Sequence, residues 1–151
     1  MTPELIRYAK AAVKRGVKLL DKIDKGWDKE IDLRRLDLSS PDHCMLGQLY
    51  FDPEGSDGDG DGHYNGYTRG ISALEAAREV RDKFYDEDDD DEIDPEVAAK
   101  YGFEAPDKAR GRGLRVEYFS FLTELWTNII EQCRKKDVTN ERKRRVAGRA
   151  L

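Results

Sequence analysis

The spacing of apolar residues near the N-terminus predicts a long amphipathic helix. Five apolar residues recur there at three- and four-residue intervals: Ile6, Ala9, Val13, Val17 and Leu20. This period places their side chains on one face of a helix. Thr2 and Pro3 form a start signal, because threonine caps free N–H groups and proline lacks the N–H that a first turn leaves unpaired. We therefore expect a helix that ends near Ile23, before Gly26.

A second long helix is predicted towards the C-terminus. Its apolar stripe follows helical spacing and consists of Phe119, Leu122, Trp126, Ile129 and Cys133. A wide stripe of this kind is typical of a helix at the centre of a core. Residues 104–113 before it contain a proline, two glycines and three basic residues, which favours a connector.

Three shorter helices are predicted between the two long ones. The first follows the start signal Ser40-Pro41-Asp42 and ends before Asp52. The second begins with the capping box of Ser72 and Glu75, and its stripe consists of Ala73, Ala76, Ala77, Val80 and Phe84. The third runs from Pro95 to Tyr101, with Gly102 as its terminator.

The segment of residues 27–38 mixes apolar spacings of two and three, so a short helical turn and an extended arm both remain open. No segment shows the sustained alternation that predicts a strand. We expect one all-α domain of about five helices over residues 1–136, with loop insertions at 52–66 and 86–94. Residues 137–151 hold few apolar side chains and are predicted to form a basic, flexible tail, or one that becomes helical only when bound.

Composition narrows the class of protein. The chain has 151 residues, of which 39% are charged and 38% hydrophobic, a size that fits one compact domain rather than a two-domain enzyme. No apolar run has the length of a membrane span, and the first ten residues do not resemble an export signal. We expect a cytoplasmic protein without a membrane partner. Cys44 and Cys133 lack a pairing pattern, and both are interpreted as packed thiols.

Charge is distributed unevenly along the chain. The net charge is -5, but the residues from Arg134 onward contribute +6 and the rest -11. Seven acidic residues follow one another at 86–92, a run that is usually solvated and could instead imitate a phosphate backbone. The candidate partner-binding residues are a ladder on the first helix and a cluster in the tail: Lys10, Lys14, Lys18, Lys22, Arg142, Lys143, Arg144 and Arg145. The alternative, and the more common case for such charged residues, is a solvated face.

An aspartate-rich loop is the strongest local motif. Asp57, Asp59 and Asp61 alternate with glycines, as in the first half of a calcium loop of the EF-hand type. In that register His63 would contribute its carbonyl oxygen and Asn65 a side-chain oxygen. Position twelve holds a threonine in place of the usual glutamate, so a solvated loop without an ion remains the alternative. A transition-metal site with His63 is a further alternative.

One stretch resembles a group of small proteins encoded by actinobacteria and their bacteriophages. It runs from Leu36-Asp37-Leu38-Ser39-Ser40-Pro41 to Cys44-Met45-Leu46-Gly47-Gln48-Leu49-Tyr50. Later landmarks of the same group are Tyr101-Gly102-Phe103 and Leu122-Thr123-Glu124-Leu125-Trp126. The resemblance implies an origin in such genomes, with the cytoplasm of a bacterial host as the location. It implies no established activity.

No enzyme signature stands out, since phosphate-binding glycine loops, paired-histidine zinc motifs and serine elbows are all missing from the sequence. We therefore expect a non-catalytic accessory protein without a cofactor, which binds a host macromolecule, most directly a protein, through its charged surfaces. A calcium-binding module is the first alternative. A weak, sequence-independent nucleic-acid binder is the second, and the sequence leaves the oligomeric state open.

Overall fold

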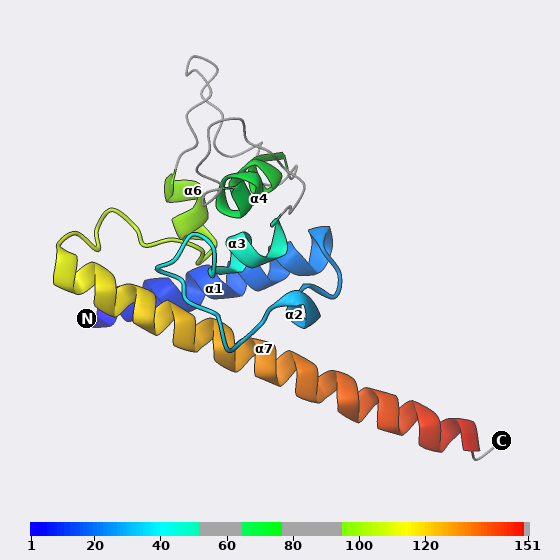
Figure 1. Cartoon of the computed structure of the whole chain (residues 1–151). Coiled ribbons are helices and arrows are strands. Elements are labelled where there is room, and N and C mark those ends of the chain that lie inside the picture. Colours follow the sequence, from blue (N-terminus) through cyan, green and yellow to red (C-terminus); the bar gives the residue numbers. More distant parts are fainter. Residues whose placement is uncertain (52–64, 77–94, 150–151) are drawn as a thin grey trace.

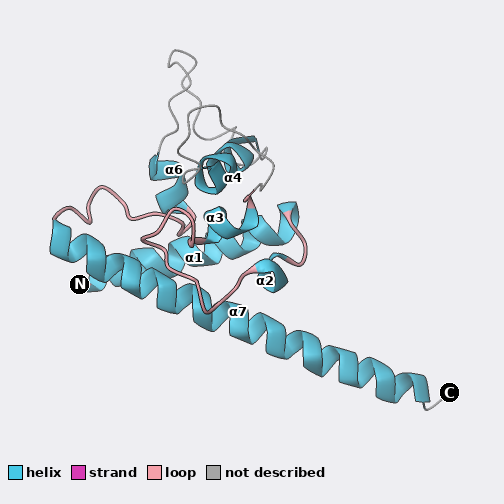
Figure 2. Cartoon of the chain, viewed as in Figure 1, coloured by secondary structure: helices cyan, strands magenta, loops and turns pink. Residues whose placement is uncertain are grey.

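The structure is a computed structural model that describes residues 1–51, 65–76 and 95–149. Its helices, in chain order, are α1 (Pro3–Ile23), α2 (Trp27–Glu30), α3 (Met45–Leu49), α4 (Asn65–Ala76), α6 (Pro95–Lys100) and α7 (Arg112–Arg149). Helices and loops account for all of the described chain, without a strand (Figure 2). The all-α prediction is confirmed, with six described helices in place of about five.

The first helix begins and ends as the sequence predicts. The Thr2 hydroxyl accepts a hydrogen bond from the Leu5 N–H at 3.2 Å, and Asp24 follows the last residue, Ile23. The buried side of α1 consists of Leu5, Ala9, Ala12, Val13, Gly16, Leu19 and Leu20. Ile6 and Val17 lie at the edge of this side and are only partly buried. The buried face is therefore turned slightly from the predicted stripe.

Trp126 of α7 lies at the centre of the core. Its ring stacks on Phe103 with centroids 5.3 Å apart and forms a T-shaped pair with Trp27, with centroids 5.6 Å apart. Its indole N–H donates to the Gly102 carbonyl oxygen at 2.7 Å. Gly102 has φ +74, a left-handed conformation that ends α6 and that glycine adopts without strain. One side chain thus joins α7 to α2 and to the segment after α6.

Helices α3 and α4 cross at very close range. A Cβ at Gly66 would collide with the Gly47 carbonyl oxygen, and one at Gly47 would collide with the Pro41 carbonyl oxygen. Glycine is required at both positions because the main chains are nearly in contact.

This contact also explains why the prediction for the middle of the chain was wrong. α4 begins at Asn65, so Ser72 lies inside the helix rather than at its cap, and the preceding insertion ends earlier than residue 66. The buried residues of α4 include Ile71 and Leu74, which the predicted stripe does not contain. Tertiary packing against α3 outweighs the low helix propensity of the glycines. The remainder of the predicted stripe, from Ala77 to Phe84, and the insertion at 86–94 lie outside the described residues.

The undecided segment after Gly26 contains a single helical turn, α2, and then a chain of turns. Asp37 holds one of these turns through its carboxylate, which accepts from the Ser39 N–H at 2.9 Å and from the Ser39 hydroxyl at 2.6 Å. α3 is capped by Cys44, whose sulfur accepts from the Gly47 N–H at 3.3 Å. The predicted start signal at Ser40–Asp42 is therefore wrong, because these residues form a turn that precedes the cap.

α7 does not end where the tail was predicted to begin. It continues without interruption from Arg112 to Arg149 and is about 57 Å long at 1.5 Å per residue. Between Leu114 and Ala147 the sequence contains neither proline nor glycine. An isolated helix of fifteen residues is marginal in water, but a helix that continues from a packed one avoids the cost of nucleation. Residues 137–149, for which the sequence predicts a basic, flexible tail, are thus part of this helix.

Candidate functional site

The C-terminal part of α7 projects away from the rest of the molecule (Figure 1). Every residue from Lys135 to Arg149 is exposed. We call residues 135–149 the basic extension. It contains seven basic and two acidic residues. A long helical surface with excess positive charge is thus presented to solvent, and this is the most distinctive feature of the described chain.

The predicted tail cluster lies in the middle of the extension. Arg142, Lys143, Arg144 and Arg145 are all exposed. The Arg145 guanidinium forms an ion pair with Glu141 one turn earlier, at 2.7 Å. Exposed pairs of this spacing contribute only about 0.3–0.5 kcal/mol, so the pair leaves the arginine available for a stronger acceptor.

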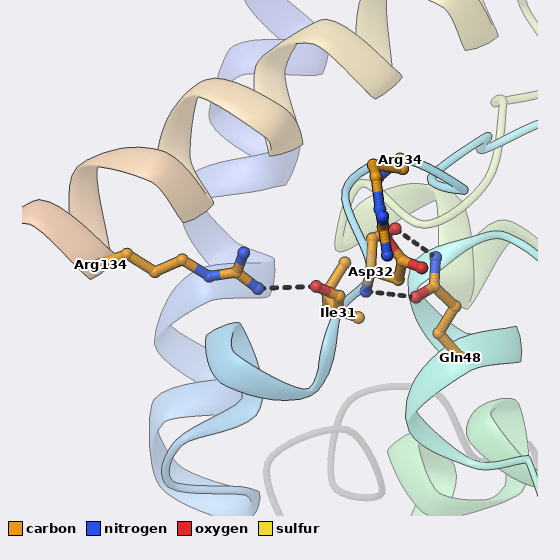
Figure 3. A network of polar contacts seen from close by, with 5 residues as sticks. All are labelled: Ile31, Asp32, Arg34, Gln48 and Arg134. Carbon is orange, nitrogen blue, oxygen red and sulfur yellow. Dashed lines mark hydrogen bonds and ion pairs between the residues drawn. The ribbon is translucent and has the colours of Figure 1, made fainter.

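The base of the extension is fixed to the body by Arg134. Its guanidinium donates to the main-chain carbonyl oxygen of Asp28. It also donates to that of Ile31 at 2.6 Å, the bond that Figure 3 shows. These carbonyls belong to the end of α2, where helical C=O groups lack partners and favour a cation. The ammonium of Lys29 lies 3.5 Å from the Asp137 carboxylate, which adds a second contact one turn further along α7. The direction of the extension is therefore set by α2.

A second network joins the segment that follows α2 to α3. The Gln48 side chain accepts from the Asp32 N–H at 2.7 Å and donates to the Asp32 carbonyl oxygen at 3.3 Å (Figure 3). The Asp32 carboxylate accepts from the Arg34 N–H at 3.0 Å, and that bond holds the pKa of Asp32 below its ordinary value. The same amide of Gln48 also donates to the His43 carbonyl oxygen at 3.0 Å. Gln48 thus joins α3 to the main chain at Asp32 and His43.

The lysine ladder of α1 lies on the exposed side of that helix. Lys10, Lys14, Lys18 and Lys22 all belong to exposed positions. The buried side of α1 packs against α6 and α7, so the ladder and the core side are separate faces. Its exposure agrees with both interpretations given above, a solvated face and a partner-binding face.

The predicted ion site falls almost entirely on residues outside the described ranges, namely Asp57, Asp59, Asp61 and His63. Asn65 is the first residue of α4. Among the residues that the structure describes, no three histidine, cysteine or acidic side chains are grouped closely enough to hold a metal ion.

Neither cysteine is poised as a nucleophile. Cys44 is buried, and burial raises the pKa of its thiol to about 11, so the thiol stays protonated at neutral pH. Burial also raises the pKa of the Cys133 thiol, on the side of α7 that faces the body. Both agree with the packed thiols that the sequence predicts.

Two features at the base of the extension carry no sequence signal. Arg134 is one residue within a charged run, and nothing in its neighbours marks it as the one that anchors α2. Asp28 is buried at 8% exposure, and its Oδ2 has no hydrogen-bond partner among the described residues. Only the three-dimensional arrangement places these two residues together.

No family model, curated protein or solved structure matches this chain. Within the described ranges, no helix has the length and apolar character needed to span a membrane.

Proposed function

We propose that this chain is a non-catalytic binding protein that presents the basic extension of α7 to an acidic surface of a partner protein. The observation that supports this function is the extension itself: fifteen consecutive exposed residues of one helix, in continuous helical register with the core. None of these fifteen side chains is buried by the described part of the chain. A regular basic helix held in a fixed direction suits recognition of a partner, because its ordering cost is met before binding.

A protein is a better partner than a nucleic acid for three reasons. The chain outside the last eighteen residues has a net charge of -11, which repels a phosphate backbone. The extension also exposes Val138 at 50% and Val146 at 69%, and these apolar side chains gain nothing from contact with phosphates. The absence of an aromatic residue from 135 to 149 further disfavours stacking on bases.

The resemblance of residues 36–50 to actinobacterial and phage proteins supports a host protein as the partner. In this structure, residues of that stretch hold turns and helix ends together: Asp37, Cys44, Gly47 and Gln48. We assign these residues a role in the fold, and the binding role to α7.

Capture from an actinobacterial lysate tests this function. The tagged full-length chain is compared with the variant R142E/K143E/R144E/R145E and with the matched control K10E/K14E/K18E/K22E, after nuclease treatment of the lysate. We expect an acidic protein that the wild type and the control retain, that salt releases, and that the extension variant loses. Retention by all three proteins, or loss only in the control, contradicts the assignment to α7.

A further inference from the structure

The two halves of α7 use different sides of the helix. Successive residues of an α-helix are rotated by roughly 100°. On this spacing the buried residues of the first half fall within one sector: Tyr118, Phe119, Leu122, Trp126 and Ile130. A second sector, roughly 150° away, contains Lys135, Val138, Arg142, Arg145, Val146 and Arg149. We call the three arginines and two valines of this sector the arginine–valine face.

The composition of this face is more selective than the charge of the whole extension. Asp137 and Glu141 fall outside it, next to the line that continues the core stripe. Lys136, Lys143 and Arg144 also fall outside it. The face therefore combines three arginines with two valines and contains no acidic residue. A shallow hollow lined by Arg134, Lys135, Val138 and Thr139 lies where it begins.

We infer that the arginine–valine face docks into a protein groove that has an apolar floor and carboxylates along its rim; this rests on the function proposed above. Val138 and Val146 are two turns apart and would contact the floor, as apolar anchors do when a helix binds in a groove. Arg142, Arg145 and Arg149 would pair with the carboxylates, which arginine can bind with two parallel hydrogen bonds. Glu141 competes for Arg145 only through an exposed pair.

Charge complementarity favours this occupant over the extension of a second copy of the chain. Two extensions placed side by side would bring two strongly basic helices together, and such a contact is repulsive. An acidic groove supplies the opposite sign and also covers the valines, which exposed phosphates do not.

Two triple variants of equal charge test the face. R142E/R145E/R149E alters the face, whereas K136E/K143E/R144E alters the other sides of the same helix by the same net charge. V138Q/V146Q removes the apolar anchors and keeps all charges. Circular dichroism verifies that each full-length variant retains its helix content.

The probes are two synthetic helical peptides of equal negative charge and a mixed-sequence DNA duplex. One peptide has leucines on one side flanked by glutamates, and the other has glutamines in place of the leucines. We expect the leucine peptide to bind the wild type most tightly. Its affinity should fall at least about tenfold, or about 1.4 kcal/mol, in R142E/R145E/R149E and less than about threefold in K136E/K143E/R144E. V138Q/V146Q should lower affinity for the leucine peptide alone.

Each other outcome has a distinct meaning. Equal losses in the two triple variants would show that charge alone binds, which overturns the face and leaves the proposed function in place. Tighter binding of the duplex than of either peptide would show that the face prefers nucleic acid, which overturns the inference that it docks into a protein groove. Binding that no variant alters would contradict both the face and the proposed function.

Discussion

The guanidinium of Arg134 donates to the main-chain carbonyl oxygen of Ile31 at 2.6 Å, across 103 positions of sequence. With the bonds to the Asp28 carbonyl oxygen, this contact closes the end of α2 and fixes α7 against it. Arg134→Ala should lower the free energy of unfolding by about 1.5–3 kcal/mol, because bonds from a charged donor are lost. The free energy of unfolding of Arg134→Lys should lie between those of the wild type and Arg134→Ala, since an ammonium lacks the guanidinium fork.

Urea denaturation followed by tryptophan fluorescence measures this effect. The matched control is Lys135→Ala at the neighbouring exposed position, which should stay within about 0.5 kcal/mol of wild type. Equal stability of the two alanine variants would show that Arg134 does not anchor α2.

The indole N–H of Trp126 provides a second prediction. Trp126→Phe leaves the Gly102 carbonyl oxygen buried without its donor, so the free energy of unfolding should fall by about 1–3 kcal/mol beyond the loss of packing. Trp27→Phe is the control, because the Trp27 N–H donates to the exposed Asp21 carboxylate, which water can solvate instead. Thermal unfolding by circular dichroism compares them, and a larger loss for Trp27→Phe would refute the argument.

Two glycine substitutions, one in α3 and one in α7, should change the stability in opposite directions. Gly47→Ala should destabilise the protein by about 1–3 kcal/mol, because the added methyl collides with the Pro41 carbonyl oxygen. Gly113→Ala lies in the first turn of α7, where an added Cβ meets nothing within 4 Å. It should stabilise the protein by up to about 1 kcal/mol. Calorimetry should give a lower melting temperature than wild type for Gly47→Ala and a higher one for Gly113→Ala.

The parts of this fold that local patterns determine are predictable from sequence. Thr2, the period of α1 and Gly102 each act through neighbours a few residues away, so the bounds of α1 and the end of α6 were predicted correctly. The start of α4 was not, because Gly66 favours a helix only once α3 lies against it.

The candidate site, too, is only partly predictable from local sequence patterns. The basic residues of the extension are evident from composition, but their conformation depends on a core helix that begins at Arg112. The low apolar content after Asp137 predicts disorder, and continuation from a packed helix reverses that prediction. The role of Arg134 depends on a contact with α2 that no local pattern contains.

The raised pKa of Cys44 predicts a loss of stability at alkaline pH. Burial raises the pKa of this thiol from 9.0 to about 11, so the folded state keeps the proton that the unfolded state loses. The stability that the protonated thiol contributes is fully present below pH 9. It is lost as the pH rises towards 11, at up to about 1.4 kcal/mol per pH unit. Cys44→Ser preserves a cap for α3 but does not titrate. Between pH 9 and 10 the wild type should lose stability faster than Cys44→Ser in urea titrations, and parallel slopes would contradict the assignment.

Proline substitutions at two exposed positions of α7 separate the extension from the core helix. Arg144→Pro breaks a segment that packs against nothing in the described chain, so the unfolding free energy should change by less than about 0.5 kcal/mol while helical ellipticity decreases. Glu124→Pro interrupts the same helix beside Leu122 and Trp126, and should cost about 3 kcal/mol or more. Tryptophan fluorescence reports the core in both variants, because Trp27 and Trp126 are its only tryptophans. A cooperative loss of core stability in Arg144→Pro would mean that the extension contributes to the fold. The proposal that this segment serves binding rather than folding would then fail.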